Sequence, residues 1–150
     1  METIYKTTLV NAPADAVWNT LTSFSQIQQW IHDSPVEVQT DWKVGSPLVI
    51  SGDLHGIPFS NSGKILAFDA GSKLSYTFLS SISGLPDKDE FHCVLEFNLT
   101  PANKQTRLDL SISNFPDEVI QKHLKLYWGP TLELIGKQAE NYIEPSVSSQ

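Results

Sequence analysis

The chain has 150 residues, 40% hydrophobic and 10% aromatic, which is the size and composition of one globular domain. Its formal net charge of -7 argues against nucleic-acid binding, because phosphate contacts need a basic face. No stretch approaches the ~18 apolar residues of a membrane span, and no basic segment followed by an apolar run opens the chain. A single cysteine, Cys93, cannot form an intrachain disulfide. We therefore expect a cytoplasmic protein, with residues 1–145 as its domain and residues 146–150 as a flexible polar tail.

The first part of the chain predicts one strand followed by two short helices. Residues with high β-propensity occupy Thr3 to Val10. Asn11 or Ala12 then suits the cap of a helix, with Pro13 early in its first turn. A second short helix is predicted from Phe24 to Trp30, where apolar residues recur at helical spacing.

The middle of the chain predicts about six antiparallel strands. From Val36 onwards apolar residues recur at every second position, which is typical of strands with one covered and one solvated face. Glycine and proline predict a turn at Gly56 to Phe59. The clearest alternation runs over the odd positions from Phe91 to Leu99 and then from Leu108 to Ile112. A hairpin loop at Thr100 to Gln105 is expected to join these two strands.

A long amphipathic helix is predicted from Asp117 to Ile143, because apolar residues follow each other at steps of three and four. Gly129 and Pro130 predict a bend in it, since the proline ring clashes with the carbonyl of Leu126. A curved sheet of about seven strands is the simplest surface that buries such a helix, so we expect an α+β fold. The predicted core includes Trp18, Leu95, Phe97, Leu110 and Leu132.

Short motifs spread over nearly the whole chain carry a family resemblance. In chain order they are Ala12-Pro13-Ala14-Asp15-Ala16-Val17-Trp18, Leu21-Thr22, Trp30, Lys43-Val44-Gly45, Phe59, Gly63-Lys64-Ile65, Lys73-Leu74-Ser75-Tyr76-Thr77-Phe78, Thr106-Arg107-Leu108, Trp128-Gly129, Leu132, Leu134 and Glu140. The chain resembles the START-like, or Bet v-type (SRPBCC), superfamily, and within it the family named after the activator of the heat-shock-protein-90 ATPase. Two departures are that the common Gly-Trp pair reads Trp128-Gly129-Pro130, and that the frequent Pro-Pro pair before Leu74 is missing.

The resemblance implies a helix-grip fold, in which a curved antiparallel sheet of about seven strands surrounds the long C-terminal helix, with two short helices after the first strand. Relatives bind lipids, polyketides or plant hormones, cyclise aromatic polyketides, or activate a chaperone. It therefore implies a cavity for a small hydrophobic or aromatic ligand, without identifying that ligand. Two alternatives stay open: an enzyme of the polyketide cyclase or hydratase type, and a chaperone-activating protein with a protein partner or a homodimer.

The predicted cavity wall is mainly aromatic, and ordinary core packing is the alternative for the same side chains. It consists of Trp30, Tyr76, Phe78, Phe91, His123, Tyr127, Trp128 and Leu132. His123 lies between Ile120 and Tyr127 on the apolar stripe of the long helix. It is therefore either a core or rim histidine, or a cavity residue that orients a ligand or moves a proton.

No residue pattern predicts a metal, a cofactor or a catalytic group. The four histidines are His32, His55, His92 and His123, and none of them shows metal-ligand spacing. No nucleophile elbow, phosphate loop, paired acidic motif or dinucleotide fingerprint is present. Asp53 and His55 are expected to share the solvated face of a strand, and Cys93 to be buried and inert.

Overall fold

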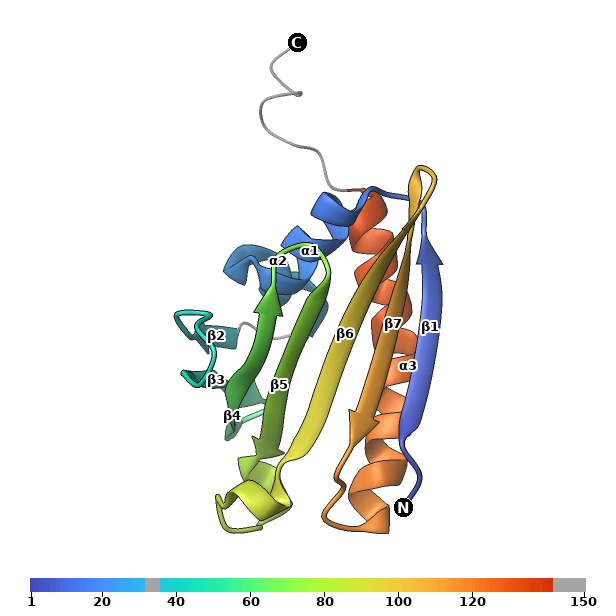
Figure 1. The fold of residues 1–150 in the computed structure, drawn as a ribbon. Coiled ribbons are helices and arrows are strands. Elements are labelled where there is room, and N and C mark those ends of the chain that lie inside the picture. Colours follow the sequence, from blue (N-terminus) through green and yellow to red (C-terminus); the bar gives the residue numbers. More distant parts are fainter. Residues whose placement is uncertain (32–35, 142–150) are drawn as a thin grey trace.

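The computed structural model describes residues 1–31 and 36–141 (Figure 1). Its elements are β1 (Ile4–Val10), α1 (Ala14–Thr22), α2 (Phe24–Ile31), β2 (Val36–Gln39), β3 (Pro47–Leu54), β4 (Ile57–Asp69), β5 (Lys73–Ser80), the short 3-10 turns η1 (Ser81–Ser83) and η2 (Asp89–Phe91), β6 (Cys93–Ala102), β7 (Gln105–Ser113) and α3 (Glu118–Glu140). The predicted tail at 146–150, His32 and the last predicted helical residue, Ile143, lie outside the described residues.

The strands form a seven-stranded sheet in the order β1-β7-β6-β5-β4-β3-β2, and every neighbouring pair is antiparallel. Figure 1 shows α3 running along one face of this curved sheet, behind β6, β7 and β1, with α1 and α2 packed at one end. This arrangement confirms the predicted α+β fold with a long C-terminal helix and two short helices after the first strand.

The hydrophobic core lies between α3 and the face of the sheet that it covers, called the inner face below. On β6 the odd residues from Cys93 to Leu99 are buried, while the even residues Val94, Glu96 and Asn98 are partly exposed. The same alternation buries Leu108, Leu110 and Ile112 on β7. The predicted core positions Leu95, Phe97, Leu110 and Leu132 are confirmed as buried.

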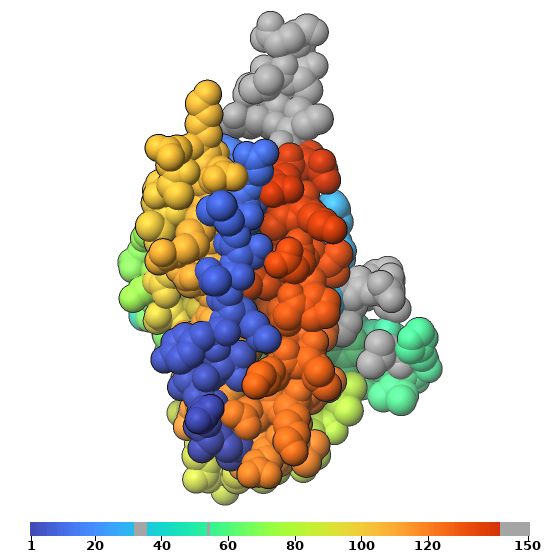
Figure 2. Space-filling model, turned by 90° about the vertical axis from the view of Figure 1, so that its right-hand side faces the viewer, coloured from blue at the N-terminus to red at the C-terminus, as the bar shows by residue number. Residues whose placement is uncertain are grey.

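The long helix begins at a side-chain cap and passes close to the first strand. Asp117 is its N-cap, and a carboxylate oxygen of Asp117 accepts a hydrogen bond from the backbone N–H of Ile120 at 2.8 Å. Near the other end, a Cβ added to Gly136 would lie 3.3 Å from Cγ2 of Val10 on β1. Figure 2 shows α3 and β1 side by side along this face of the molecule. Pro130 lies inside the helix and is exposed.

Two predicted turns are shorter in the structure than the sequence indicated. The turn predicted at Gly56 to Phe59 consists of His55 and Gly56, and β4 already begins at Ile57. Both residues have positive φ, at 53° and 89°, which is the geometry of a two-residue hairpin. His55 is therefore not on a strand face with Asp53. The predicted loop from Thr100 to Gln105 shrinks likewise, because β6 runs to Ala102 and β7 starts at Gln105.

Three further predictions need correction. Phe91 belongs to the 3-10 turn η2 and not to β6, which begins at Cys93. The cap of α1 is Pro13, which makes no side-chain cap hydrogen bond, and not Asn11 or Ala12. Trp18 is only half-buried, because its ring lies edge-on against Phe68 at the margin of the core, with a centroid separation of 5.1 Å.

Candidate functional site

A cluster of aromatic rings lies where α2 and α3 meet the inner face of the sheet. Its centre is Trp128 of α3, whose ring centroid is 6.0 Å from Trp30 on α2 and 5.8 Å from Phe97 on β6. Tyr127 packs edge-on against Trp128 at 5.4 Å. Tyr76 of β5 joins through Phe97, at a centroid separation of 6.3 Å. Four predicted wall residues therefore come together, with Phe97 as a member that was predicted only as core.

Some polar atoms of this cluster have a hydrogen-bond partner in the protein and one does not. The indole N–H of Trp30 donates to the carbonyl of Thr20 at 2.9 Å, and the hydroxyl of Tyr127 donates to the carbonyl of Ile31 at 2.8 Å. The hydroxyl of Tyr76, by contrast, makes no hydrogen bond within residues 1–31 and 36–141, although Tyr76 as a whole is only 7% exposed. A hydroxyl without a protein partner on a largely buried side chain is a group to which a ligand or water can hydrogen-bond.

Burial also determines how the two tyrosines ionise. It raises the pKa of Tyr76 well above its usual value, and the nearby Tyr127 adds to that shift. Burial raises the pKa of Tyr127 as well, partly opposed by a hydrogen bond involving Thr131. Both hydroxyls are therefore protonated at neutral pH and can act as hydrogen-bond donors or acceptors, not as bases.

The other predicted wall residues lie on α3, β5 and η2. Leu132 is buried one turn further along α3, and Phe78 and Phe91 are partly buried on β5 and η2. His123 is exposed, and its ring stacks on Tyr127 with centroids 6.5 Å apart. The structure therefore places His123 on the outer side of Tyr127, away from the aromatic cluster.

A second aromatic group was not predicted from the sequence. The rings of Phe24, Trp42, Phe68 and Trp18 follow each other with centroid separations of 6.0, 5.4 and 5.1 Å. Trp42 has a φ of 62°, an unusual backbone conformation for a large side chain. No periodic pattern surrounds Trp42 in the sequence, and only its aromatic character could have indicated it.

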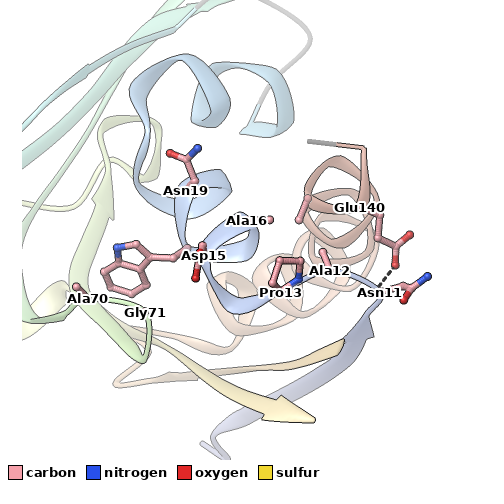
Figure 3. A pocket seen from close by; sticks show the side chains of 11 residues that line it. Asn11, Ala12, Pro13, Asp15, Ala16, Asn19, Ala70, Gly71 and Glu140 are labelled. Atoms are coloured by element: carbon pink, nitrogen blue, oxygen red, sulfur yellow. Dashed lines mark hydrogen bonds between the residues drawn. The ribbon is translucent and has the colours of Figure 1, made fainter. Parts of the chain in front are cut away.

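Two surface pockets lie away from the predicted wall. One, of about 630 Å³, lies where the start of α1 meets the end of α3 and the β4–β5 turn (Figure 3). Trp18 and Gly71 line it, and the backbone N–H of Asn11 donates to Glu140 at 2.8 Å beside it. The other, of about 360 Å³, lies over β1, β6 and β7 and is lined mainly by polar side chains.

Titratable groups outside the aromatic cluster form no catalytic arrangement in the described part of the chain. His92 is buried, and its Nε2 lies 2.6 Å from a carboxylate oxygen of Asp87. This hydrogen bond lowers the pKa of Asp87. Burial raises the pKa of Cys93 to about 11, so its thiol is protonated at neutral pH. No three histidine, cysteine or acidic side chains among the described residues are placed to hold a metal ion together.

Residues 11–139 match the family model for activator of Hsp90 ATPase homolog 1-like protein. The chain belongs to this family. Among solved structures of similar fold, the protein ChR145 of Cytophaga hutchinsonii is 32% identical, with a TM-score of 0.77 over 99% of this chain and 97% of that protein. This match confirms the resemblance to the activator family that the sequence motifs indicated.

Two more distant structures share the fold of this activator-family chain. The Aha1 dimer of Colwellia psychrerythraea is 16% identical, with a TM-score of 0.73 over 94% of this chain and 98% of that one. DynU16, a protein from the dynemicin biosynthetic locus, is 18% identical, with a TM-score of 0.70 over 97% of this chain and 48% of that one. No curated protein matches the sequence of this chain. None of the helices in residues 1–31 and 36–141 has the length and hydrophobicity of a membrane span.

Proposed function

We propose that this activator-family chain binds a small apolar or aromatic ligand between α3 and the inner face of the sheet. The proposed wall keeps Trp30, Tyr76, Phe78, Phe91, Tyr127, Trp128 and Leu132 of the predicted set, adds Phe97, and leaves out the exposed His123. One observation carries the proposal: Trp30, Tyr76, Phe97, Tyr127 and Trp128 form a largely buried aromatic cluster, in which the hydroxyl of Tyr76 makes no hydrogen bond to the described residues. Ligand sites are typically apolar and aromatic, with a few unpaired polar groups that orient the ligand.

A titration with N-phenyl-1-naphthylamine, an uncharged apolar fluorescent probe, tests the proposal. The probe should quench tryptophan fluorescence on binding, because Trp30 and Trp128 lie in the proposed wall. Trp128→Phe should weaken its binding several-fold, since the smaller ring leaves part of the contact surface empty. Trp42→Phe, in the second aromatic group, is the matched control and should bind as the wild type does. Native mass spectrometry of protein from its own source would then identify a retained ligand.

Two results would reject this proposal. One is a wild-type protein that does not bind the probe at concentrations where the probe is soluble. The other is that Trp128→Phe and Trp42→Phe weaken probe binding equally while both variants keep a native circular dichroism spectrum. The probe would then bind away from the aromatic cluster.

A protein partner is the second candidate function, and an apolar stripe on the outer side of α3 favours it. Val119, Leu126 and Leu134 are 76%, 79% and 54% exposed, and their spacing of seven and eight residues places them on one side of the helix. If this chain stimulates an Hsp90-type ATPase through that stripe, Leu126→Glu should abolish the stimulation. An ATPase assay with and without the chain measures this. Unaltered stimulation by the variant would exclude the stripe.

The cyclase or hydratase alternative receives no comparable support. General acid catalysis in a cavity needs a titratable group held inside it. Every aspartate and glutamate within residues 1–31 and 36–141 is exposed or half-exposed, and His123 is exposed. The buried His92 is not one of the residues of the aromatic cluster, and its Nε2 is paired with Asp87 at 2.6 Å. The tyrosines of the aromatic cluster stay protonated at neutral pH, so they can position a ligand without acting as bases.

A further inference from the structure

Asn61 interrupts an otherwise apolar row of residues on the inner face of the sheet. On β4 the buried residues Phe59 and Ile65 point to this face, and Asn61 has the same parity between them. On the neighbouring strand β3, Asn61 pairs with Ile50, and Ile50 in turn pairs with Val38 on β2. Ile50 and Val38 are both buried in the core. An amide side chain therefore lies where its neighbours on two strands are hydrophobic.

The amide of Asn61 has no hydrogen-bond partner in the described part of the chain. Its Oδ1 is fully buried and has no hydrogen-bond partner there, while the residue as a whole is half-buried. Ser80, the residue opposite Asn61 on β5, uses its hydroxyl to accept from the backbone N–H of Ile82 at 3.3 Å. An unpaired buried amide destabilises a protein relative to an apolar residue of similar size. The unpaired Oδ1 of Asn61 is thus a place where a polar group of a ligand can bind.

We propose that Asn61 binds a hydroxyl group of the ligand, an inference that rests on the proposed function. A hydroxyl donates and accepts at once, so it pairs with either end of an amide. The neighbours of Asn61 on β3 and β2 are hydrophobic, so the part of the ligand that lies on that side is apolar. The ligand class is therefore an alcohol or a phenol with an apolar body.

Tyr76 provides a second polar contact point at a different place on the same face. It lies opposite Ile65, four residues along β4 from Asn61, which is about 13 Å at the usual rise of a strand. The two groups therefore contact different parts of a ligand. For this reason the role of Asn61 can be measured without changing the aromatic cluster.

Two probes of similar size test the proposal, because 2-naphthol carries a hydroxyl where 2-methylnaphthalene carries a methyl group. Isothermal titration calorimetry should show that the wild type binds 2-naphthol about tenfold more tightly, the typical effect of one buried hydrogen bond. Asn61→Leu should weaken 2-naphthol binding about tenfold and leave 2-methylnaphthalene binding within twofold of the wild-type value. Ser60→Ala is the control, because Ser60 is exposed on the opposite face of the same strand.

The outcomes separate this proposal from the function on which it rests. If the wild type binds 2-methylnaphthalene at least as tightly as 2-naphthol, the role of Asn61 is refuted even if Asn61→Leu does not fold, while ligand binding stands. Equal weakening of both probes by Asn61→Leu also refutes it, because Asn61 would then only shape the site. If neither probe binds the wild type, the proposed function fails and this inference fails with it.

Discussion

The hydroxyl of Tyr127 donates a hydrogen bond to the backbone carbonyl of Ile31, 96 residues earlier in the chain, at 2.8 Å. This bond joins the middle of α3 to the last residue of α2. The neighbouring residue, Trp128, packs its ring against Trp30 on α2, so a polar and an apolar contact connect the same two helices. The position of α2 beside the aromatic cluster therefore depends on α3.

Removing this hydroxyl should loosen the contact between the two helices. Tyr127→Phe keeps the aromatic ring but leaves the carbonyl of Ile31 without its partner, which costs about 1 kcal/mol. We expect the melting temperature to fall by roughly 2–4 °C for a protein of this size. Tyr5→Phe is the control, because Tyr5 is exposed on β1. Identical melting curves for the wild type and Tyr127→Phe would contradict the expectation.

The buried face of β7 should dominate stability. Leu110 is 1% exposed, so Leu110→Ala removes a fully packed side chain and should cost roughly 2–5 kcal/mol of unfolding free energy. Leu126→Ala changes the same side chain on the outer side of α3 and should cost under about 0.5 kcal/mol. Urea unfolding followed by circular dichroism compares the two variants. Similar losses of unfolding free energy in both variants would show that the burial of the leucine does not determine its contribution to stability.

Cys93 should make stability fall at alkaline pH. Burial raises the pKa of its thiol to about 11 in the folded protein, whereas an unfolded cysteine titrates near ~8.5. The folded state therefore favours the protonated thiol, and this contribution is complete below about pH 8.5 and is lost as pH rises towards 11. Between these values the wild type should lose on the order of 2–3 kcal/mol more than Cys93→Ala. Parallel pH profiles of unfolding free energy for both proteins would exclude this role.

The sequence predicted the parts of the fold in which a single periodicity decides burial. The odd residues from Cys93 to Leu99 follow a period of two because one face of β6 packs on the core and the other meets solvent. His55 and Asn103 could not be placed in the same way. Each adopts a positive φ that is set by tight strand pairing and has no regular sequence signature outside glycine.

The candidate site was predicted in part, and the errors have a geometric cause. Trp30, Tyr76 and Tyr127 lie on faces that the periodicity identified, whereas Trp128 follows Tyr127 by one residue and was indicated only by its aromatic character. His123 precedes the buried Leu124 by one residue, which turns it about 100° around a helix of 3.6 residues per turn. That rotation places His123 at the edge of the apolar stripe, where it is exposed.

Pro130 is the residue through which the long helix should regulate access to the site. It is exposed inside α3, and proline costs about 3 kcal/mol relative to alanine in a helix interior. Pro130→Ala restores a backbone N–H that can bond the carbonyl of Leu126, so the melting temperature should rise. If the bend predicted at Gly129 and Pro130 is where α3 separates from the sheet, the same variant should bind N-phenyl-1-naphthylamine more weakly.

The alternative is that the predicted bend only follows the curvature of the sheet. A straightened helix would then strain its contact with β1, where Gly136 lies close to Val10, and the melting temperature would fall. Thermal melting and probe titration on the wild type and Pro130→Ala distinguish the two accounts. Glu133→Ala is the control, because Glu133 is exposed on the same helix. A less stable Pro130→Ala with unchanged probe affinity would end the gating hypothesis, because the helix would then have strained without altering entry to the site.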